Sequence, residues 1–290
     1  MTGAYPEEGD GAAVHWLELG SQRLRCVCSG ADDAPPVLLF PGWGCTSYSF
    51  RGNLPALAAA GFRAISVELP GQGWSDKPTG EDSYSLQALA RAAIQVLDEL
   101  RIERAPLIGA SLGGAIALQI ALASLQRVTR IVLWSPIGFG CSPLVHAAAQ
   151  LPLSLSVGIE RLAGRQLVRV LLRLVYGGDH APHPRDVEQY ELPIHTPRFV
   201  WSQMALLRNV RWDQMPPSEL ARLTLPITIV TGTKDPLVPI GRLADAAATL
   251  ADGRLCVVRG AGHAANETHP GQINGETLAA LRVPDALPTS

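Results

Sequence analysis

The chain has 290 residues, of which 47% are hydrophobic and 17% are charged, and its formal net charge is −2. These values are typical of a globular protein with a sizeable core. They exclude an intrinsically disordered chain, which combines low apolar content with high net charge. The chain also lacks the strongly basic character that nucleic-acid binding requires, so we expect no nucleic-acid partner.

The N-terminus, the apolar segments and the cysteines indicate where the protein resides. Residues 1–12 are predicted to be disordered, and they contain neither the basic nor the apolar region of a secretory signal. Residues 144–159 are apolar, but His146, Gln150 and Pro152 interrupt them, so we expect no membrane span. The five cysteines show no metal-ligand spacing, which predicts reduced thiols, a cytoplasmic protein and no metal site.

Short β-rich segments alternate with helical patterns in the first half of the chain. Residues 14–19 and 23–29 predict an antiparallel pair, and residues 37–40 predict a strand that is buried on both faces. The elements predicted after them are a helix at 49–60, a strand at 63–67, a helix at 85–100, a strand at 105–109, a helix at 112–125 and a strand at 128–134. This alternation is typical of βαβ units and of a mostly parallel sheet.

A helical insertion interrupts the alternation. Residues 136–212 show helical patterns broken by prolines, and we expect them to form a cap (lid) on the core. The elements predicted after the cap are a strand at 227–231, a helix at 240–251, a strand at 254–259 and a helix at 271–281. The sequence therefore predicts an eight-stranded α/β core at 13–135 and 213–284, followed by a tail at 285–290.

Ser111 is the centre of a G-x-S-x-G pattern that runs from Gly109 to Gly113, between a predicted strand and a predicted helix. A tight turn from strand to helix requires small residues on both sides of the serine and holds the hydroxyl in a strained, exposed position. A serine that only caps the helix is the alternative interpretation. The location between strand and helix favours a nucleophile, because few chance matches have both neighbours.

His263 is the candidate general base, because it follows the last predicted strand and two glycines precede it within three positions. A serine hydroxyl becomes a good nucleophile only when an adjacent base takes its proton. Asp235, after the preceding predicted strand, is the candidate carboxylate that orients this base, although an aspartate before proline is also a turn former. Glu68 and Asp76 are weaker candidates, because both precede Ser111 in the chain.

The order Ser111, Asp235, His263 is the one that α/β-hydrolases use. The chain resembles the α/β-hydrolase-fold superfamily over residues 14–281, in its capped branch of esterases and epoxide hydrolases. The resemblance implies a mostly parallel, eight-stranded α/β-hydrolase sheet flanked by helices, a helical cap and no cofactor. The motifs that carry it are residues 41–44 (PGWG), 68–78 (ELPGQGWSDKP), 109–113 (GASLG), 232–235 (GTKD) and 262–263 (GH).

An oxyanion hole formed by the backbone N–H groups of Trp43 and Leu112 is a further implication of the resemblance. Two such donors stabilise the negative charge that develops on a carbonyl oxygen during acyl transfer. The family commonly has His-Gly where this chain has Pro41-Gly42. The Trp43 amide remains available, but the change leaves open which groups support this loop. The plain alternative is that residues 41–44 are only a tight turn.

Phe139, Tyr176, Trp201 and Met204 are the candidate substrate-binding residues of the cap. Together they suit a hydrophobic small molecule, although each is also explained by core packing. A cap above Ser111 would exclude water from the reaction and shape the substrate pocket.

Arg161, Arg165, Arg169 and Arg173 recur every four residues and therefore share one face of a predicted helix. A solvated face is the favoured interpretation. An anionic partner, such as a carboxylate substrate, a phosphopantetheine-type thioester or a lipid headgroup, is the alternative. Because another face of this helix is apolar, contact with a membrane surface is a third and less favoured interpretation.

The favoured function is hydrolysis of a carboxylic ester or thioester through an acyl-enzyme on Ser111. The same fold also supports carbon–carbon bond hydrolysis, as in meta-cleavage-product hydrolases, but those enzymes usually carry Asn at the position of Ala110 and Trp at that of Ala264. Epoxide hydrolases and haloalkane dehalogenases use an aspartate nucleophile, which Ser111 argues against. A third alternative is a non-catalytic ligand-binding protein of the same fold. The apparently complete triad argues against it, because binding alone does not require a triad. Neither the substrate nor the oligomeric state follows from the sequence.

Overall fold

The computed structural model describes residues 3–140, 147–210 and 215–282, apart from the side chain of Arg161. The predicted tail at 285–290 and two short parts of the predicted cap, 141–146 and 211–212, lie outside the described residues.

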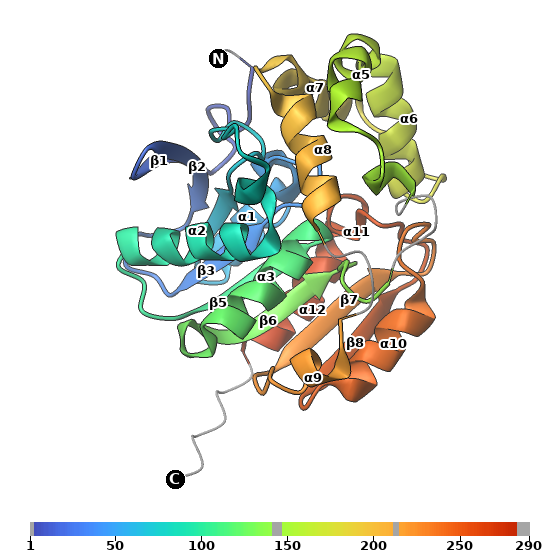
Figure 1. The fold of residues 1–290 in the computed structure, drawn as a ribbon. Coiled ribbons are helices and arrows are strands. Elements are labelled where there is room, and N and C mark those ends of the chain that lie inside the picture. The colour runs from blue at the N-terminus through green and yellow to red at the C-terminus, as the bar shows by residue number, and fades with distance from the viewer. Residues whose placement is uncertain (1–2, 141–146, 211–214, 283–290) are drawn as a thin grey trace.

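Within the described residues, eight strands form one sheet in the order β1-β2-β4-β3-β5-β6-β7-β8 (Figure 1). β1 pairs with β2, and β2 with β4, in antiparallel orientation, whereas the strands from β3 to β8 are parallel. The mostly parallel, eight-stranded sheet predicted from the sequence is confirmed. The strands are β1 (Ala13–Leu19), β2 (Gln22–Ser29), β3 (Pro36–Phe40), β4 (Arg63–Glu68), β5 (Ala105–Ala110), β6 (Val128–Trp134), β7 (Ile227–Gly232) and β8 (Gly253–Val258).

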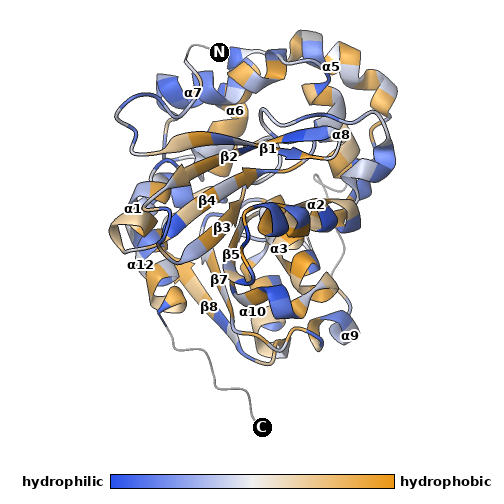
Figure 2. Cartoon of the chain, turned by 90° about the vertical axis from the view of Figure 1, so that its left-hand side faces the viewer, coloured by the Kyte–Doolittle hydropathy of each residue, from blue (hydrophilic) through white to orange (hydrophobic). Residues whose placement is uncertain are grey.

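Helices cover both faces of this sheet. Figure 2 shows α1 and α12 on one side of the strands and α2, α3 and α10 on the other. Their bounds are α1 (Leu54–Ala59), α2 (Leu86–Glu99), α3 (Leu112–Ala123), α10 (Ile240–Thr249) and α12 (Pro270–Leu281), with the short helices α9 (Pro217–Leu220) and α11 (Ala265–Thr268) between them.

The alternation of side chains along the strands divides the core into two layers. In β3, Leu38 and Phe40 pack in the layer of α2, α3 and α10, whereas Val37 and Leu39 pack in the layer of α1 and α12. All four side chains are fully buried. Successive residues of a strand face opposite sides of a sheet, so a strand covered on both sides reads as a continuous apolar run.

A helical region connects β6 to β7, as the sequence predicted. Figure 1 places its helices at the end of the molecule that is remote from the C-terminus. Side chains from these helices form a third apolar cluster, which includes Val168, Val187 and Val200. The elements are a 3₁₀ turn at Leu153–Leu155, α5 (Ser156–Leu162), α6 (Arg165–Val175), α7 (Pro184–Glu191), a 3₁₀ turn at Leu192–His195 and α8 (Phe199–Asn209).

The predicted helix at 49–60 is two elements in the structure. A 3₁₀ turn spans Ser47–Phe50, and α1 begins separately at Leu54. Pro55 lies in the first turn of α1, the place in a helix where a proline's missing N–H and fixed φ are tolerated. A continuous helix through residue 55 would lose a hydrogen bond and clash with the preceding turn.

The N-terminal segment also differs from the predicted disorder, because Tyr5 is anchored in the protein. The side chain of Tyr5 is 3% exposed and its ring lies edge-on to that of Tyr48. Its N–H donates to Gln189 Oε1 at 2.9 Å, and its carbonyl accepts from Arg25. These contacts join it to residues far along the chain, so the polar local sequence gives no sign of them.

Two glycine-to-alanine substitutions test how tightly α3 packs on the sheet. A Cβ at Gly113 would overlap the carbonyl of Phe40, whereas exposed Gly275 in α12 has open space around it. We expect Gly113→Ala to lower the free energy of unfolding by about 3 kcal/mol or more, because backbone atoms must shift. Gly275→Ala should raise it by about 0.5–1 kcal/mol, since alanine favours the helix. Urea unfolding measures both; equal effects would contradict the packing.

Candidate active site

Ser111 lies in the turn between β5 and α3, at the carboxyl end of a central strand. Its backbone has φ 52° and ψ −112°, a conformation that is strained for a residue with a side chain. Hydrogen bonds to neighbouring residues stabilise this strained conformation. Ser111 N–H donates to the Trp134 carbonyl at 2.9 Å, and the Ser111 carbonyl accepts from Ile137 N–H at 3.2 Å. A Cβ at Gly109 would collide with the backbone of Gly113, so the turn needs glycine there.

His263 and Asp235 lie beside Ser111, on the loops that follow β8 and β7. His263 Nε2 is 2.9 Å from Ser111 Oγ, and His263 Nδ1 is 2.9 Å from Asp235 Oδ2. The side chain of Asp235 is fully buried and that of His263 is 9% exposed. In the neutral tautomer that donates from Nδ1 to Asp235, Nε2 accepts the Ser111 proton. The three residues proposed from the sequence are therefore brought together in a chain of hydrogen bonds.

Asp235 is fixed by the backbone as well as by His263. Its Oδ1 accepts from the N–H groups of Leu237 at 2.8 Å and Val238 at 3.0 Å. Burial alone would raise the pKa of Asp235, but the adjacent His263 and these hydrogen bonds outweigh it and hold the pKa below its usual value of 3.8. Asp235 is therefore ionised at neutral pH, as a carboxylate that orients an imidazole must be.

The rival carboxylates from the sequence have other partners. Glu68 is fully buried and pairs with Arg25 at 2.9 Å, while it accepts from the N–H groups of Ser47 and Trp74. Asp76 accepts from the backbone N–H of Arg23. These contacts anchor the loop after β4 to the antiparallel strands, so both carboxylates have structural roles.

The loop that carries His263 packs directly against the C-terminal end of α6. Ala264 N–H donates to the Val175 carbonyl at 3.0 Å, and a Cβ at Gly262 would collide with the backbone of Tyr176 and Gly177. The glycine before the histidine is therefore required for this close approach. The position of the catalytic candidate His263 depends on the helical region as well as on the core.

The loop at 41–44, where the resemblance implies an oxyanion hole, is supported by two glutamines. Gln203 in α8 accepts from Gly44 N–H through Oε1 at 2.9 Å, and its backbone carbonyl accepts from the Trp43 indole at 2.8 Å. Gln72 donates to the Pro41 carbonyl at 3.2 Å. Leu112, the other implied donor, is the first residue of α3, where backbone N–H groups lack helical partners.

Sequence reasoning did not identify Gln203 or Gln72 as parts of the site. Gln203 also donates to the Gly71 carbonyl at 2.7 Å, so one side chain joins the loops after β3 and β4. Gln72 lies within a motif that resembles the family, which is a signal that could have found it. Gln203 lies within a helical pattern where nothing local separates it from a solvated glutamine.

The four cap residues proposed as substrate-binding are mainly packed side chains. Phe139 is fully buried in the core, and Met204, at 6% exposed, belongs to the apolar cluster of the cap. The Trp201 ring lies edge-on to Tyr84 and under the Arg198 guanidinium. The Tyr176 hydroxyl donates to Glu267 at 3.1 Å. Their contact with a substrate remains a prediction.

Glu267, four residues after His263, is the centre of a buried polar network between the helical region and the core. Its carboxylate accepts from Tyr190 of α7 and from Arg51 of the core, both at 2.6 Å, in addition to Tyr176. Arg51 also pairs with Asp186 of α7 at 2.8 Å. Burial raises the pKa of Glu267, and Arg51 and the hydrogen bonds oppose this without cancelling it. The network fastens two helices of the insertion to the helix that follows His263.

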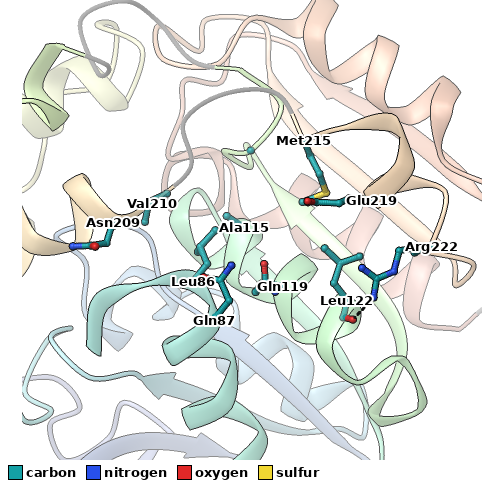
Figure 3. A pocket seen from close by; sticks show the side chains of 11 residues that line it. Leu86, Gln87, Ala115, Gln119, Leu122, Asn209, Val210, Met215, Glu219 and Arg222 are labelled. Carbon is teal, nitrogen blue, oxygen red and sulfur yellow. Dashed lines mark hydrogen bonds between the residues drawn. The ribbon is translucent and has the colours of Figure 1, made fainter. Parts of the chain in front are cut away.

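A cavity of about 560 Å³ lies along α3, and Figure 3 shows the side chains around it. Ala115, one helical turn after Ser111, contributes to its wall, but Ser111, Asp235 and His263 do not. Most of the rest of the described wall comes from Gln119 and Leu122 of α3 and from residues in or next to α2, α8 and α9. None of the described residues that line this cavity pairs a nucleophile with a base, so the hydrogen-bonded Ser111, His263 and Asp235 are the better candidate for the chemistry.

Neither a metal site nor a membrane-spanning helix is indicated among the described residues. The parts of the chain that the structure describes contain no cluster of three His, Cys, Asp or Glu side chains arranged for a metal ion. Among the same residues, no helix combines the length and the apolar character that crossing a bilayer demands.

The family of the chain follows from a match over most of its length. The model of the alpha/beta hydrolase family matches residues 37–276, which include Ser111, Asp235 and His263. The chain belongs to the alpha/beta hydrolase family. It is therefore most simply a hydrolase that acts on a small molecule, as is typical of this family.

Individual relatives of this family member differ in activity. The chain is 31% identical to 2-hydroxy-6-oxononadienedioate/2-hydroxy-6-oxononatrienedioate hydrolase of Cupriavidus pinatubonensis, over 87% of the chain and 88% of the relative. It is 29% identical to the magnesium-chelatase 30 kDa subunit of Rhodobacter capsulatus, with the same coverage. The carboxylesterase CesB of Bacillus subtilis superposes with a TM-score of 0.79 at 21% identity, over 96% of this chain and 93% of that one. The last likeness shows the fold alone.

The lowered pKa of Asp235 predicts a contribution to acid stability. Because the folded pKa lies below the unfolded value of 3.8, ionised Asp235 stabilises the fold fully above that value and loses this effect as pH falls through the folded pKa. The free energy of unfolding of Asp235→Asn should therefore fall less than that of the wild type between neutral pH and about pH 3. Exposed Asp252→Asn is the control, and an unchanged pH profile in Asp235→Asn would contradict the assignment.

The Glu267 network predicts a difference between two tyrosine-to-phenylalanine variants. Tyr190→Phe removes a hydrogen bond to a buried carboxylate and should cost about 1.5–3 kcal/mol in the free energy of unfolding. Tyr84→Phe removes a bond to the Pro78 carbonyl, which keeps Arg198 as a donor, and should cost about 1 kcal/mol or less. Chemical denaturation of both variants measures the difference; a cost for Tyr190→Phe no larger than that for Tyr84→Phe would show that the network adds no stability.

Proposed function

We propose that the protein is a serine hydrolase that cleaves a carboxylic ester or thioester of a hydrophobic small molecule through an acyl-enzyme. One observation carries the proposal: Ser111 Oγ, the His263 ring and the Asp235 carboxylate form a continuous chain with both links at 2.9 Å. This geometry matches the requirements of a nucleophile, a general base and a carboxylate that orients the base.

The reaction follows from the order of the contacts. His263 Nε2 takes the Ser111 proton while Oγ attacks the carbonyl carbon, and the tetrahedral intermediate collapses as His263 returns the proton to the leaving alcohol or thiol. Water activated by the same Nε2 then hydrolyses the acyl-enzyme and restores the free hydroxyl. Asp235 keeps the Nδ1–H tautomer and stabilises the imidazolium that forms in each half of the reaction.

Backbone N–H groups of Trp43 and Leu112 are the proposed donors to the oxyanion. The N–H of Leu112 lies at the N-terminus of α3, where the helix dipole favours negative charge. The Trp43 loop is held by Gln203 and Gln72, so its amide is fixed before the substrate binds. Each donor to an oxyanion contributes about 3–4 kcal/mol to transition-state stabilisation.

The proposed hydrophobic substrate would contact apolar side chains near the Trp43 loop. Met204 and Trp201 belong to α8, the helix whose Gln203 supports the Trp43 loop, and the Trp43 side chain is itself 38% exposed. We expect an acyl or alcohol group to lie between these side chains under the helical region, which acts as a cap that excludes water.

A fluorophosphonate probe and a series of p-nitrophenyl esters of increasing acyl length test the proposal. The wild type should be labelled at Ser111 and should hydrolyse the esters, whereas Ser111→Ala and His263→Ala should lose about 10⁴–10⁶-fold in kcat. Asp235→Ala should lose less than either. Ser124→Ala, which changes a serine at the far end of α3, is the matched control and should retain full activity.

Two results would refute the assignment. A wild type that neither reacts with the probe nor hydrolyses any ester is not an esterase. Full activity in Ser111→Ala would show that another group is the nucleophile.

Carbon–carbon bond hydrolysis is the second candidate, because a relative of that named activity is 31% identical over most of both chains. The same Ser111 and His263 would serve this reaction, while Ala110 and Ala264 depart from the residues usual in such enzymes. Turnover of a vinylogous 1,5-diketone, followed by loss of its absorbance, without comparable ester hydrolysis would favour this alternative.

A further inference from the structure

The cap has an unusual outer surface. Eleven large hydrophobic side chains are exposed among the described residues, and eight of them lie between residues 151 and 174. Figures 1 and 2 both place α5 and α6, which include most of this segment, at the end of the molecule opposite the C-terminus. Single exposed apolar residues are ordinary, but such a concentration marks an interaction surface.

Helix α6 has three distinct stripes. Val168 and Leu172 are buried and hold the helix on the cap. A second stripe is exposed and apolar, with the spacing i, i+3, i+4, i+7 that places its members on one face. Its members are Leu167 (41% exposed), Val170 (64%), Leu171 (44%) and Leu174 (42%).

The third stripe is basic and exposed. Arg165, Arg169 and Arg173 follow one another at intervals of four and lie between the buried and the apolar stripes. Arg165 pairs with Glu191 at 3.0 Å. Within the described part of the chain, Arg169 and Arg173 have no acidic partner. Two guanidinium groups beside an exposed apolar stripe are thus available to an anionic surface.

We propose that α6 docks this protein on the surface of an anionic membrane. The apolar stripe enters the boundary between headgroups and acyl chains, and Arg169 and Arg173 bind lipid phosphates at its side. A helix with one apolar face and an arginine-rich polar side is suited to lying in the membrane interface, where area burial and electrostatic attraction add together.

The charges beside the apolar stripe distinguish three possible partners of this surface: a second copy of the chain, a soluble anion and an anionic membrane. An antiparallel twofold dimer through α6 would place Arg169 and Arg173 opposite the arginines of the second copy. A soluble anion would satisfy the two arginines but leave four apolar side chains in water. An anionic membrane satisfies both stripes at once.

The docked helix leads directly to the candidate active site. Val175, the last residue of α6, accepts the N–H of Ala264, next to His263. The helix that carries the docking surface is therefore hydrogen-bonded to the loop that carries the proposed base.

Sedimentation with vesicles tests the docking without any substrate, so its outcome is independent of the proposed hydrolysis. Wild-type protein is mixed with vesicles of phosphatidylcholine alone and of phosphatidylcholine with phosphatidylglycerol. We expect binding to the anionic vesicles that weakens as salt is added, because the Arg169 and Arg173 contacts are screened. Binding to phosphatidylcholine alone should be much weaker.

Two double variants separate the apolar and the basic contributions. Arg169→Gln with Arg173→Gln should weaken binding to the anionic vesicles about 30-fold and remove most of the salt dependence. Val170→Ser with Leu174→Ser should weaken it at least about tenfold. The matched controls, Arg91→Gln with Arg259→Gln and Val14→Ser with Val257→Ser, change exposed side chains elsewhere and should bind as the wild type does.

Thermal unfolding and far-ultraviolet circular dichroism establish that each variant is folded. Wild-type protein that stays in the supernatant with anionic vesicles overturns the proposal. The same holds for α6 variants that sediment like the wild type. A concentration-dependent dimer, measured by light scattering and abolished by Val170→Ser with Leu174→Ser, without vesicle binding, would assign the surface to a second copy instead.

Discussion

The strand-to-helix turn at Ser111 is the constraint on which the rest of the site depends. A residue with a side chain is held at φ 52°, and the structure retains it because Trp134, the last residue of β6, and Ile137, in the loop after β6, hydrogen-bond to its backbone. Gly109 and Gly113 allow the first turn of α3 to pack on the strand without a side chain between them. The hydroxyl is therefore exposed at the carboxyl ends of the strands. The loops after β7 and β8 begin at the same ends, which brings Asp235 and His263 within reach of the hydroxyl.

The candidate site belongs to the core and to the helical insertion together. Gln203 of α8 supports the Trp43 loop, Val175 of α6 accepts from the His263 loop, and Glu267 binds Tyr190 of α7. Each of these contacts crosses from one part to the other. A movement of the helical region would consequently change the position of His263, the proposed base, and of the loop at 41–44, the proposed oxyanion loop. This is the geometric reason that substrate binding under a cap can be coupled to the alignment of the catalytic groups.

The two sides of α6 show why exposure has to be read from the structure. Val168 and Leu172 stabilise the cap, whereas Leu167, Val170, Leu171 and Leu174 contribute nothing to the described core. In the sequence all six residues read as one apolar pattern, and the arginines between them read as a solvated face. Only the packing of the helix on α7 separates the apolar residues that are buried from those that remain available to a partner.

Local residue patterns were enough to predict where the strands lie along the chain, the strand-to-helix turn and the three residues of the candidate triad. Those features have local signals: apolar runs, glycines at fixed offsets, and a serine, an aspartate and a histidine that each follow a strand. The packing of the N-terminal segment and the roles of Gln203 and Glu267 became visible only in the folded protein, whereas the break before α1 has a local signal, Pro55, that the prediction missed. Arg51 and Glu267 are 216 positions apart, and Trp43 and Gln203 are 160 apart. Contacts over such separations arise from how the elements pack, and no local pattern of residues records them.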